Sequence, residues 1–255
     1  MTPIILYQDE DLLVIDKPVG MVVNRAESVK GETVQDWVEK NTFLTRDNEP
    51  ASTRIQRGEH RTEDGTEEDK EFLSRAGIVH RIDKETSGIL LIAKHPASFR
   101  ELQRQFKERE VKKTYCALIH GNVPEEGEIR APIDRLPWNR EQFGVVPGGK
   151  ESVTRFKRMK SYEVRNGDKT EKISFVEVYP ETGRTHQIRV HFKYLGYPLV
   201  GDYLYGGRKQ SRDDREWAPR VMLHAYKIAF SHPITHAPLA FEAPIPDDMK
   251  RIINE

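Results

Sequence analysis

Short apolar segments of strand length recur along the whole chain, separated by polar turn residues, and few stretches have helical periodicity. The first two, Ile4–Tyr7 and Leu12–Ile15, flank the polar turn Gln8–Asp11 and predict a hairpin. Further strands are predicted at residues 89–93, 112–120, 152–159, 172–179, 222–230 and 239–241. Many strands with few, scattered helices indicate an α+β fold with a mixed, largely antiparallel central β-sheet flanked by helices, and argue against a regular βαβ array.

Helical spacing is confined to a few stretches. Phe99, Leu102 and Phe106 form an apolar stripe that predicts a helix from Pro96 to about Arg109. Other helices are predicted at residues 33–41, 184–195 and 246–254. We expect residues 1–255 to form one domain, with a disordered acidic insertion at about 45–75, because Glu59–Glu71 carries seven acidic and two basic residues and almost no apolar ones.

Several classes of protein are excluded at once. The chain of 255 residues is long enough to bury a core, and Cys116 is its single cysteine, which excludes a disulfide scaffold and a thiolate metal cluster. No apolar run approaches the roughly 18 to 20 residues that a membrane-spanning helix needs. The N-terminal residues lack the basic start and cleavage site of a signal peptide. We therefore expect a monomer in the reducing cytoplasm, with no membrane partner.

The charge of the chain is balanced in total but not along its length. There are 41 basic and 41 acidic residues. Residues 1–80 hold 10 basic and 17 acidic groups (net −7), residues 81–220 hold 28 and 20 (net +8), and residues 221–255 hold 3 and 4 (net −1). A basic central part of this kind suggests a polyanionic partner.

Three polar segments lie beside apolar strands, where a rigid scaffold can display catalytic groups. They are His80–Gly88, Lys112–Ala117 and Thr182–His191. Asp83 is a candidate nucleophile or base, or else an aspartate that caps a turn. Arg184 stands at the start of a predicted helix, which is unfavourable for a cation. It is therefore expected to pair with a carboxylate, unless it is solvated.

The nine histidines do not form a recognisable metal site. His186 and His191 are five positions apart, about 140° around a helix, which does not suit two ligands of one ion. His80 and Asp83 lack a third ligand at a recognisable spacing. Pro147–Lys150 is rich in glycine but lacks the spacing of a phosphate-binding loop. No metal is predicted.

The three polar segments together resemble a family pattern. His80–Gly88 (HRIDKETSG) is similar to the HRLDxxTSG signature of the RluA-type pseudouridine synthases. Lys113–Ala117 resembles the KxYxA strand of that family, and Gly183–His191 its GRTHQIRVH block. Lesser matches near the N-terminus, at Gly201–Gly206 and at Leu223–Ala225 extend the resemblance from about residue 4 to residue 245.

The resemblance implies a pseudouridine synthase fold and a cofactor-free isomerase that converts uridine to pseudouridine in structured ribosomal or transfer RNA. Asp83 would be the essential aspartate, which attacks the sugar or assists departure of the base. Arg184 would pair with Asp83 and keep it ionised. Tyr115 would lie against the uracil, either stacking on it or transferring a proton at carbon 5. The chain begins at the first strand of the catalytic domain, so we expect no N-terminal RNA-binding domain.

The same resemblance implies a set of RNA contacts. Arg81 would enter the RNA stack in place of the flipped uridine, and Ile188 would line the pocket. The other residues of the matching blocks expected to contact RNA are His80, Thr86, His186, Gln187 and Arg189. Because RNA affinity depends mainly on phosphate contacts, basic side chains nearby are expected to contribute. They are Arg104, Lys112 and Lys113.

Two alternative functions stay open at this point. The first is an RNA-binding or ribosome-assembly factor that keeps the fold without catalysis, although such a protein would not need Asp83, Tyr115 and Arg184 together. The second is a metal-dependent hydrolase that uses the histidines. Release of tritium from RNA labelled at carbon 5 of uridine separates the isomerase from both.

Overall fold

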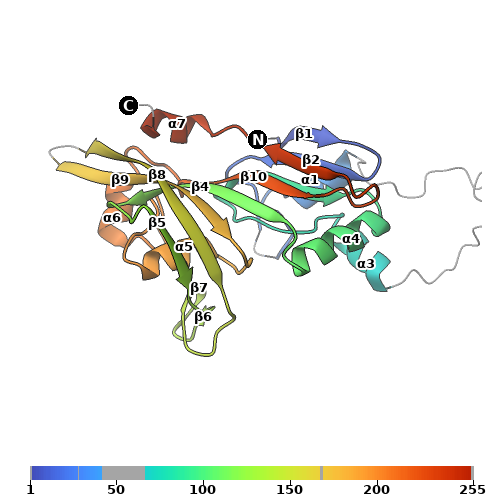
Figure 1. Cartoon of the computed structure of the whole chain (residues 1–255), viewed down its shortest axis with the longest axis horizontal. Coiled ribbons are helices and arrows are strands. Elements are labelled where there is room, and N and C mark those ends of the chain that lie inside the picture. The colour runs from blue at the N-terminus through green and yellow to red at the C-terminus, as the bar shows by residue number, and fades with distance from the viewer. Residues whose placement is uncertain (1, 28, 42–66, 167–168, 254–255) are drawn as a thin grey trace, which may run out of the picture.

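A long twisted β-sheet forms the centre of the molecule (Figure 1). The computed structural model describes the chain except residues 1, 28, 42–66, 167–168 and 254–255. In that part the main sheet has nine strands in the order β1-β2-β3-β10-β4-β9-β8-β5, with β11 also paired to β10. Its strands are β1 (Ile4–Gln8), β2 (Leu12–Lys17), β3 (Ser87–Ala93), β4 (Lys112–His120), β5 (Glu126–Arg130), β8 (Val153–Asn166), β9 (Lys169–Pro180), β10 (Leu223–Ser231) and β11 (Pro238–Glu242). Strands β6 (Ile133–Leu136) and β7 (Asn139–Val145) form a separate hairpin.

Strand β10 lies in the middle of the sheet and makes it mixed. It pairs in parallel with β3 and antiparallel with β4, whereas the other pairs are antiparallel. At the parallel junction Gly88 has a φ of +110°, and a Cβ there would stand 2.3 Å from the Ala225 carbonyl oxygen. Only glycine fits this backbone approach. The predicted α+β class with a largely antiparallel sheet is confirmed.

Helices cover both faces of the sheet. Successive side chains of β4 point to opposite faces of the sheet. Ala117 packs in a cluster with Ile188 of α5, whereas Leu118 packs in a cluster with Met249 of α7. In Figure 1, α4 and α5 accordingly lie below the sheet and α7 lies above it. The helices are α1 (Val34–Lys40), α3 (Glu67–Ser74), α4 (Pro96–Lys107), α5 (Gln187–Tyr194), α6 (Arg208–Asp214) and α7 (Asp247–Ile253). Among the described residues no helix is both long and apolar enough to cross a membrane.

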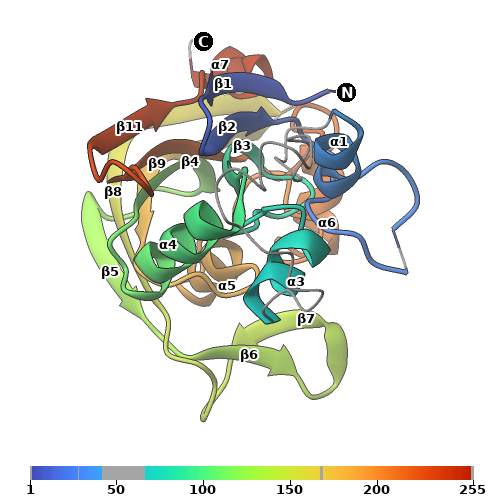
Figure 2. The ribbon, with the colours of Figure 1, turned by 90° about the vertical axis from the view of Figure 1, so that its right-hand side faces the viewer.

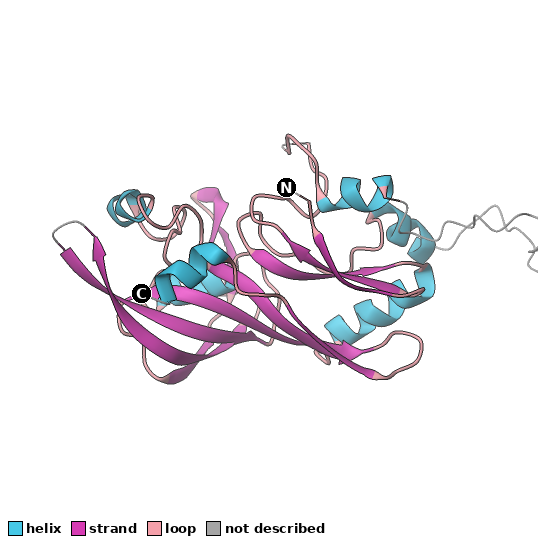
Figure 3. Cartoon of the chain, turned by 90° about the horizontal axis from the view of Figure 1, so that it is seen from above, coloured by secondary structure: helices cyan, strands magenta, loops and turns pink. Residues whose placement is uncertain are grey.

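Most predicted elements are present, with some changes of length. Strand β4 has its predicted bounds, whereas β8 and β9 form a longer ribbon that extends from the sheet at the end opposite the β1–β2 hairpin (Figure 3). Helix α5 begins at Gln187 and not at Arg184, because His186 has a left-handed φ of 55° that a helix cannot contain. Strands β5, β6 and β7 and helix α6 were not predicted.

The end of the expected acidic insertion is ordered. Residues 67–74 form helix α3, so the prediction of disorder is wrong for them. Phe72 is 2% exposed and packs edge-on against Phe99 of α4, with ring centroids 5.7 Å apart. The Gln35 side chain also donates to the Ser74 carbonyl oxygen. One buried aromatic ring and one capped end thus hold an otherwise acidic helix on the core, whereas residues 42–66 of the expected insertion lie outside the described part.

Candidate active site

A cleft of about 760 Å³ opens on the face that carries α4 and α5. All three polar segments singled out in the sequence contribute to its walls, together with the end of α4. Figure 2 shows the ribbons of α4 and α5 below those of β2 and β3. The predicted site residues that line it are Arg81, Asp83, Tyr115, Arg184, His186, Ile188, His80, Thr86, Lys113, Gln187 and Arg189. Arg104 and Lys112 do not line it. The fold therefore gathers residues that are about a hundred positions apart in the sequence.

Hydrogen bonds hold the loop that carries Asp83 in place. The Thr86 amide donates to the Asp83 carbonyl oxygen at 3.1 Å, which closes a turn just before β3. The Lys17 ammonium, fully buried at the end of β2, donates to the carbonyl oxygens of Pro18, Met21 and Lys84. Burial lowers the pKa of Lys17 to about 7, although the negative charge of Asp83 opposes that shift. Lys17 thus fastens the Asp83 loop to the central sheet.

The arginine that reaches Asp83 is Arg189. Its Nη1 lies 3.3 Å from Asp83 Oδ2, and its side chain is 6% exposed. Its Nε and Nη2 each donate at 2.8 Å to the carboxylate of Asp202, which is fully buried. The predicted ion pair between Arg184 and Asp83 is therefore wrong. The prediction that Arg189 contacts RNA is also not supported, since its guanidinium is occupied inside the protein.

Arg184 belongs to an exposed turn on the rim of the cleft. Its Nε donates to the Glu151 carbonyl oxygen at 3.3 Å, and its amide donates to the Gln187 side chain at 3.0 Å. Because α5 begins only at Gln187, Arg184 does not lie in the first helical turn, and the dipole argument for a carboxylate partner does not apply. The positive charge of Arg184 faces solvent.

Tyr115 and Lys113 project from one face of β4 into the cleft. Burial raises the pKa of Tyr115, and the nearby negative charge of Asp83 adds to the shift. The phenol therefore keeps its proton at neutral pH. Burial lowers the pKa of Lys113 to about 8, so most of this ammonium is charged at pH 7.

His80 is packed into the wall of the cleft and is poorly placed to bind RNA. Its ring stacks on Phe106 with centroids 4.6 Å apart, and its Nε2 accepts a hydrogen bond of 3.0 Å from the Leu91 amide. Burial, together with the charge of Lys113, lowers the pKa of His80 to about 3. Burial likewise lowers the pKa of His224 to about 4. Both imidazoles are neutral in the folded protein at neutral pH.

These two histidines predict loss of stability in mild acid. Between pH 6.5 and the lowered pKa values, the unfolded chain binds protons that the folded chain does not, so the stability falls as the pH falls. Each histidine is expected to cost about 1 kcal/mol per pH unit in this range. Denaturation by urea at pH 7 and pH 5 measures the loss, and His80→Gln should reduce it. The exposed His236 offers a control, His236→Asn, and an equal effect of both substitutions would contradict the assignment.

The other predicted RNA contacts differ in whether their side chains are free or already occupied inside the protein. Arg81 is exposed on the rim and Ile188 is a buried part of the wall. Gln187 is buried and bonds to Thr182, Arg184 and residues of β8, so it has no free group for RNA. Arg104 is held by Glu101, Glu108 and Glu110, which compete with any phosphate. The Thr86 hydroxyl is buried without a partner, and Lys112 is exposed.

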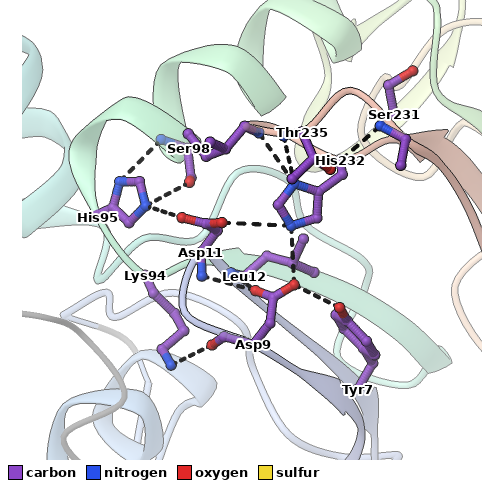
Figure 4. Close-up of polar contacts among 12 residues, drawn as sticks. Tyr7, Asp9, Asp11, Leu12, Lys94, His95, Ser98, Ser231, His232 and Thr235 are labelled. Carbon is purple, nitrogen blue, oxygen red and sulfur yellow. Dashed lines mark hydrogen bonds and ion pairs between the residues drawn. The ribbon is translucent and has the colours of Figure 1, made fainter.

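A second polar cluster, away from the cleft, contains Asp9, Asp11 and His232 at metal-ligand distances (Figure 4). Nδ1 of His232 accepts the amide protons of Ile234 and Thr235, so the imidazole proton of the neutral ring is on Nε2. Nε2 then donates to Asp9 at 3.0 Å and has no lone pair for a metal. This cluster is a hydrogen-bonded tie between the β1–β2 and β10–β11 turns. His120, Glu171 and Asp214 form a similar group that joins β4, β9 and α6.

Three residues close to Asp83 were not predicted as functional, namely Lys17, Asp202 and Tyr205. Each stands in a lesser matching block of the sequence, but its residue type alone gives no hint of a role near the cleft. Asp202 binds Arg189, and the Tyr205 hydroxyl lies 2.9 Å from Nδ1 of His186. Asp202 and Tyr205 reach the site because the Gly201–Gly206 turn packs against α5.

Comparison with known proteins relates the chain to enzymes that modify RNA. The sequence profile described as RNA pseudouridylate synthase matches residues 11–194. The chain is 36% identical over 257 residues to ribosomal large subunit pseudouridine synthase D of Neisseria meningitidis, covering 98% of this chain and 60% of that protein. It is 37% identical over 251 residues to the uncharacterized RNA pseudouridine synthase YlyB of Bacillus subtilis, covering 98% of this chain and 71% of that one.

A solved structure agrees with the fold. Human RNA pseudouridylate synthase domain containing 1 superposes with a TM-score of 0.67 at 27% sequence identity, over 95% of this chain and 83% of that one. The chain thus spans about three fifths of the length of the Neisseria relative, and most of the human chain.

Proposed function

The chain belongs to the RNA pseudouridylate synthase family, and from that premise we propose that it isomerises specific uridines in structured RNA to pseudouridine. The observation that carries the proposal is the Asp83 carboxylate in the cleft. It is 20% exposed, is faced by the buried Arg189, and shares the cleft with Tyr115. One accessible carboxylate, held by a fixed cation beside an aromatic ring, suits chemistry at the sugar of a nucleoside.

The cleft favours a uridine that has left its base stack. Asp83, Tyr115 and Ile188 line it, whereas Arg81 lies exposed at its rim. A base inside a helix cannot reach a recessed carboxylate, so the target nucleotide must rotate outward, at a cost of a few kcal/mol for unstacking. We propose that Arg81 occupies the vacated place in the stack, where its planar guanidinium can replace the lost base contacts.

The reaction needs no second substrate, because pseudouridine is an isomer of uridine. The bond between ribose C1′ and uracil N1 breaks, the uracil turns, and C1′ bonds to C5. The proton on C5 leaves to solvent, and N1 takes up a proton. Asp83 would act at the sugar, as nucleophile or as base. Tyr115 would pack against the uracil; because its phenol keeps its proton, it is better suited to contact with the base than to removal of the C5 proton.

The range of substrates is also a proposal. The name of the Neisseria relative specifies the large ribosomal subunit, so we propose ribosomal RNA as the first substrate to test and transfer RNA as the second. We further propose that residues 1–255 form a single catalytic domain. The monomeric state and cytoplasmic location stay predictions.

Tritium release tests the function directly. Transcripts of large-subunit ribosomal RNA and of transfer RNAs, labelled with [5-³H]uridine, are incubated with the purified chain. We expect one class to release tritium to solvent until a plateau is reached at a whole number of uridines per RNA, because each C5–H bond is broken once per product. Mapping pseudouridine in the reacted RNA then identifies the site.

The controls separate the isomerase from a binding protein. The same RNA labelled at cytidine should release nothing. If the chain binds these RNAs, as measured by filter retention, but releases no tritium from any of them, the isomerase proposal is wrong and a catalytically inactive RNA-binding factor on this fold is favoured.

A further inference from the structure

The Gly201–Gly206 turn lies directly behind the two donors that face Asp83. These donors are Arg189 Nη1, 3.3 Å from Asp83 Oδ2, and His186 Nε2, 3.9 Å from the same oxygen. Asp202 accepts from Arg189 Nε and Nη2, both at 2.8 Å. Because this bidentate pair fixes the plane of the guanidinium, it also fixes the direction in which the remaining nitrogen, Nη1, points.

Tyr205 constrains the second donor, His186, in a comparable way. The Tyr205 hydroxyl accepts the Phe143 amide proton at 3.1 Å and lies 2.9 Å from Nδ1 of His186. Of the two partners that the described residues offer this hydroxyl, the Phe143 amide can only donate, so the hydroxyl proton goes to Nδ1, which can accept it. Nδ1 is then an acceptor, so the proton of a neutral His186 is on Nε2, the nitrogen that faces Asp83.

The protonation state of His186 agrees with this arrangement. Burial is the largest influence on its pKa and lowers it, which outweighs the opposing charge of Asp83. The imidazole is therefore neutral at pH 7, and its single proton must be on one nitrogen or the other. His186 also has a φ of 55°, which is uncommon for a residue other than glycine. Backbone strain of this kind is typical of residues whose orientation serves the function.

The turn itself cannot shift easily. Gly201 has a φ of +73°, and a Cβ there would stand 1.8 Å from the Arg220 carbonyl oxygen. Asp202 Oδ1 also accepts the amide protons of Leu204 and Tyr205, each at 3.1 Å. The Arg189 guanidinium lies over the Tyr205 ring, 5.0 Å from its centroid. One rigid turn thus holds both donors.

We propose that Asp202 and Tyr205 are positioning residues for the isomerisation. Asp202 acts through Arg189, which donates a hydrogen bond to Asp83 Oδ2 at 3.3 Å. Tyr205 acts through His186, whose Nε2 faces the same oxygen at 3.9 Å, beyond hydrogen-bond distance. The carboxylate is thereby held in one orientation toward the sugar. The consequence for the reaction rests on the proposed function, whereas the tautomer of His186 can be measured without it.

Tyr205→Phe is the sharpest test, because it removes one hydroxyl and keeps the ring beneath Arg189. We expect kcat for tritium release to fall about tenfold while KM for RNA changes less than about twofold, since orientation and not binding is lost. In ¹⁵N NMR spectra of histidine side chains, the His186 signals should change from the Nε2–H tautomer to a mixture. Tyr194→Phe is the matched control, because Tyr194 is 61% exposed at the end of α5.

Asp202→Asn tests the other half of the proposal. The amide places a donor against a nitrogen of Arg189, so the guanidinium should turn and kcat should fall by about a hundredfold at nearly unchanged KM. Asp202→Glu keeps the charge and should recover part of the lost kcat. Full activity of Asp202→Asn would overturn the role of Asp202, whichever way Tyr205→Phe behaves.

The results for Tyr205 are equally decisive. Wild-type kcat in Tyr205→Phe, or a wild-type His186 that carries its proton on Nδ1, would overturn the role of Tyr205. If the wild-type chain releases no tritium from any RNA, the proposed function fails, but the NMR comparison still decides whether Tyr205 sets the tautomer of His186.

Discussion

Asp83→Asn is expected to lower tritium release at least about a thousandfold, because the amide can act neither as a nucleophile nor as a base toward the ribose. RNA affinity should change less than about twofold, since affinity is carried mainly by phosphate contacts. The carbonyl oxygen of the new amide can still accept from Arg189, so the fold should be retained. Single-turnover assays with saturating enzyme measure the chemical step, and filter binding measures affinity.

The matched control is Asp247→Asn, which removes the same charge from a side chain that is 89% exposed in α7. This variant should react at the wild-type rate. If Asp83→Asn and Asp247→Asn released tritium at the same rate, Asp83 would not be the catalytic group. Loss of activity together with loss of the folded near-ultraviolet dichroism signal would instead assign Asp83 a structural role.

Arg189→Ala is expected to damage both stability and activity. Asp202 is fully buried, and removal of the guanidinium would leave its charge, among the described residues, with the backbone amides of Leu204 and Tyr205. Breaking a buried pair in this way costs about 3 to 5 kcal/mol. Activity should also fall steeply, because Asp83 loses the cation that faces it. Arg189→Lys should restore charge but not the forked geometry, and so recover stability only in part. Urea denaturation and tritium release on the same samples measure both effects.

Arg212→Ala is the control for this substitution, because Arg212 is 78% exposed in α6. We expect it to unfold and react like the wild type. Should Arg189→Ala unfold at the wild-type urea concentration, the buried pair with Asp202 would not contribute to stability as the structure implies. Should it also keep wild-type activity, Asp83 would not depend on Arg189.

The sheet could be read from the sequence wherever apolar residues alternate or run together. The alternation of residues over Lys112–His120 predicts β4 with its observed bounds. Strand β5 was missed because Glu126–Arg130 contains a single buried residue, Ile129. Helix α3 was missed for a related reason, since tertiary contacts such as those of Phe72 with Phe99 and of Gln35 with Ser74 hold an acidic segment. Such contacts depend on tertiary packing and leave no periodic pattern.

The site was predictable as a set of residues but not as a network. The matching blocks located Asp83, Tyr115 and Arg189 in one cleft. Which arginine binds Asp83 depended on where α5 begins, and the left-handed residue His186 displaces that start by one turn. Local spacing therefore favoured Arg184, whereas the structure uses Arg189. The roles of Asp202 and Tyr205 depend on a turn that reaches α5 only in the folded chain.

The central position of β10 has a consequence for how the protein is made. Strands β3 and β4 are synthesised long before residues 223–231, yet both need β10 to complete their hydrogen bonding. Until then a growing chain presents two unpaired apolar strand edges, which invite pairing with other chains. Insertion of a late strand between two early ones also makes the folding contacts long-range and slow to form. Nascent chains of this protein should therefore need protection by chaperones until β10 has left the ribosome.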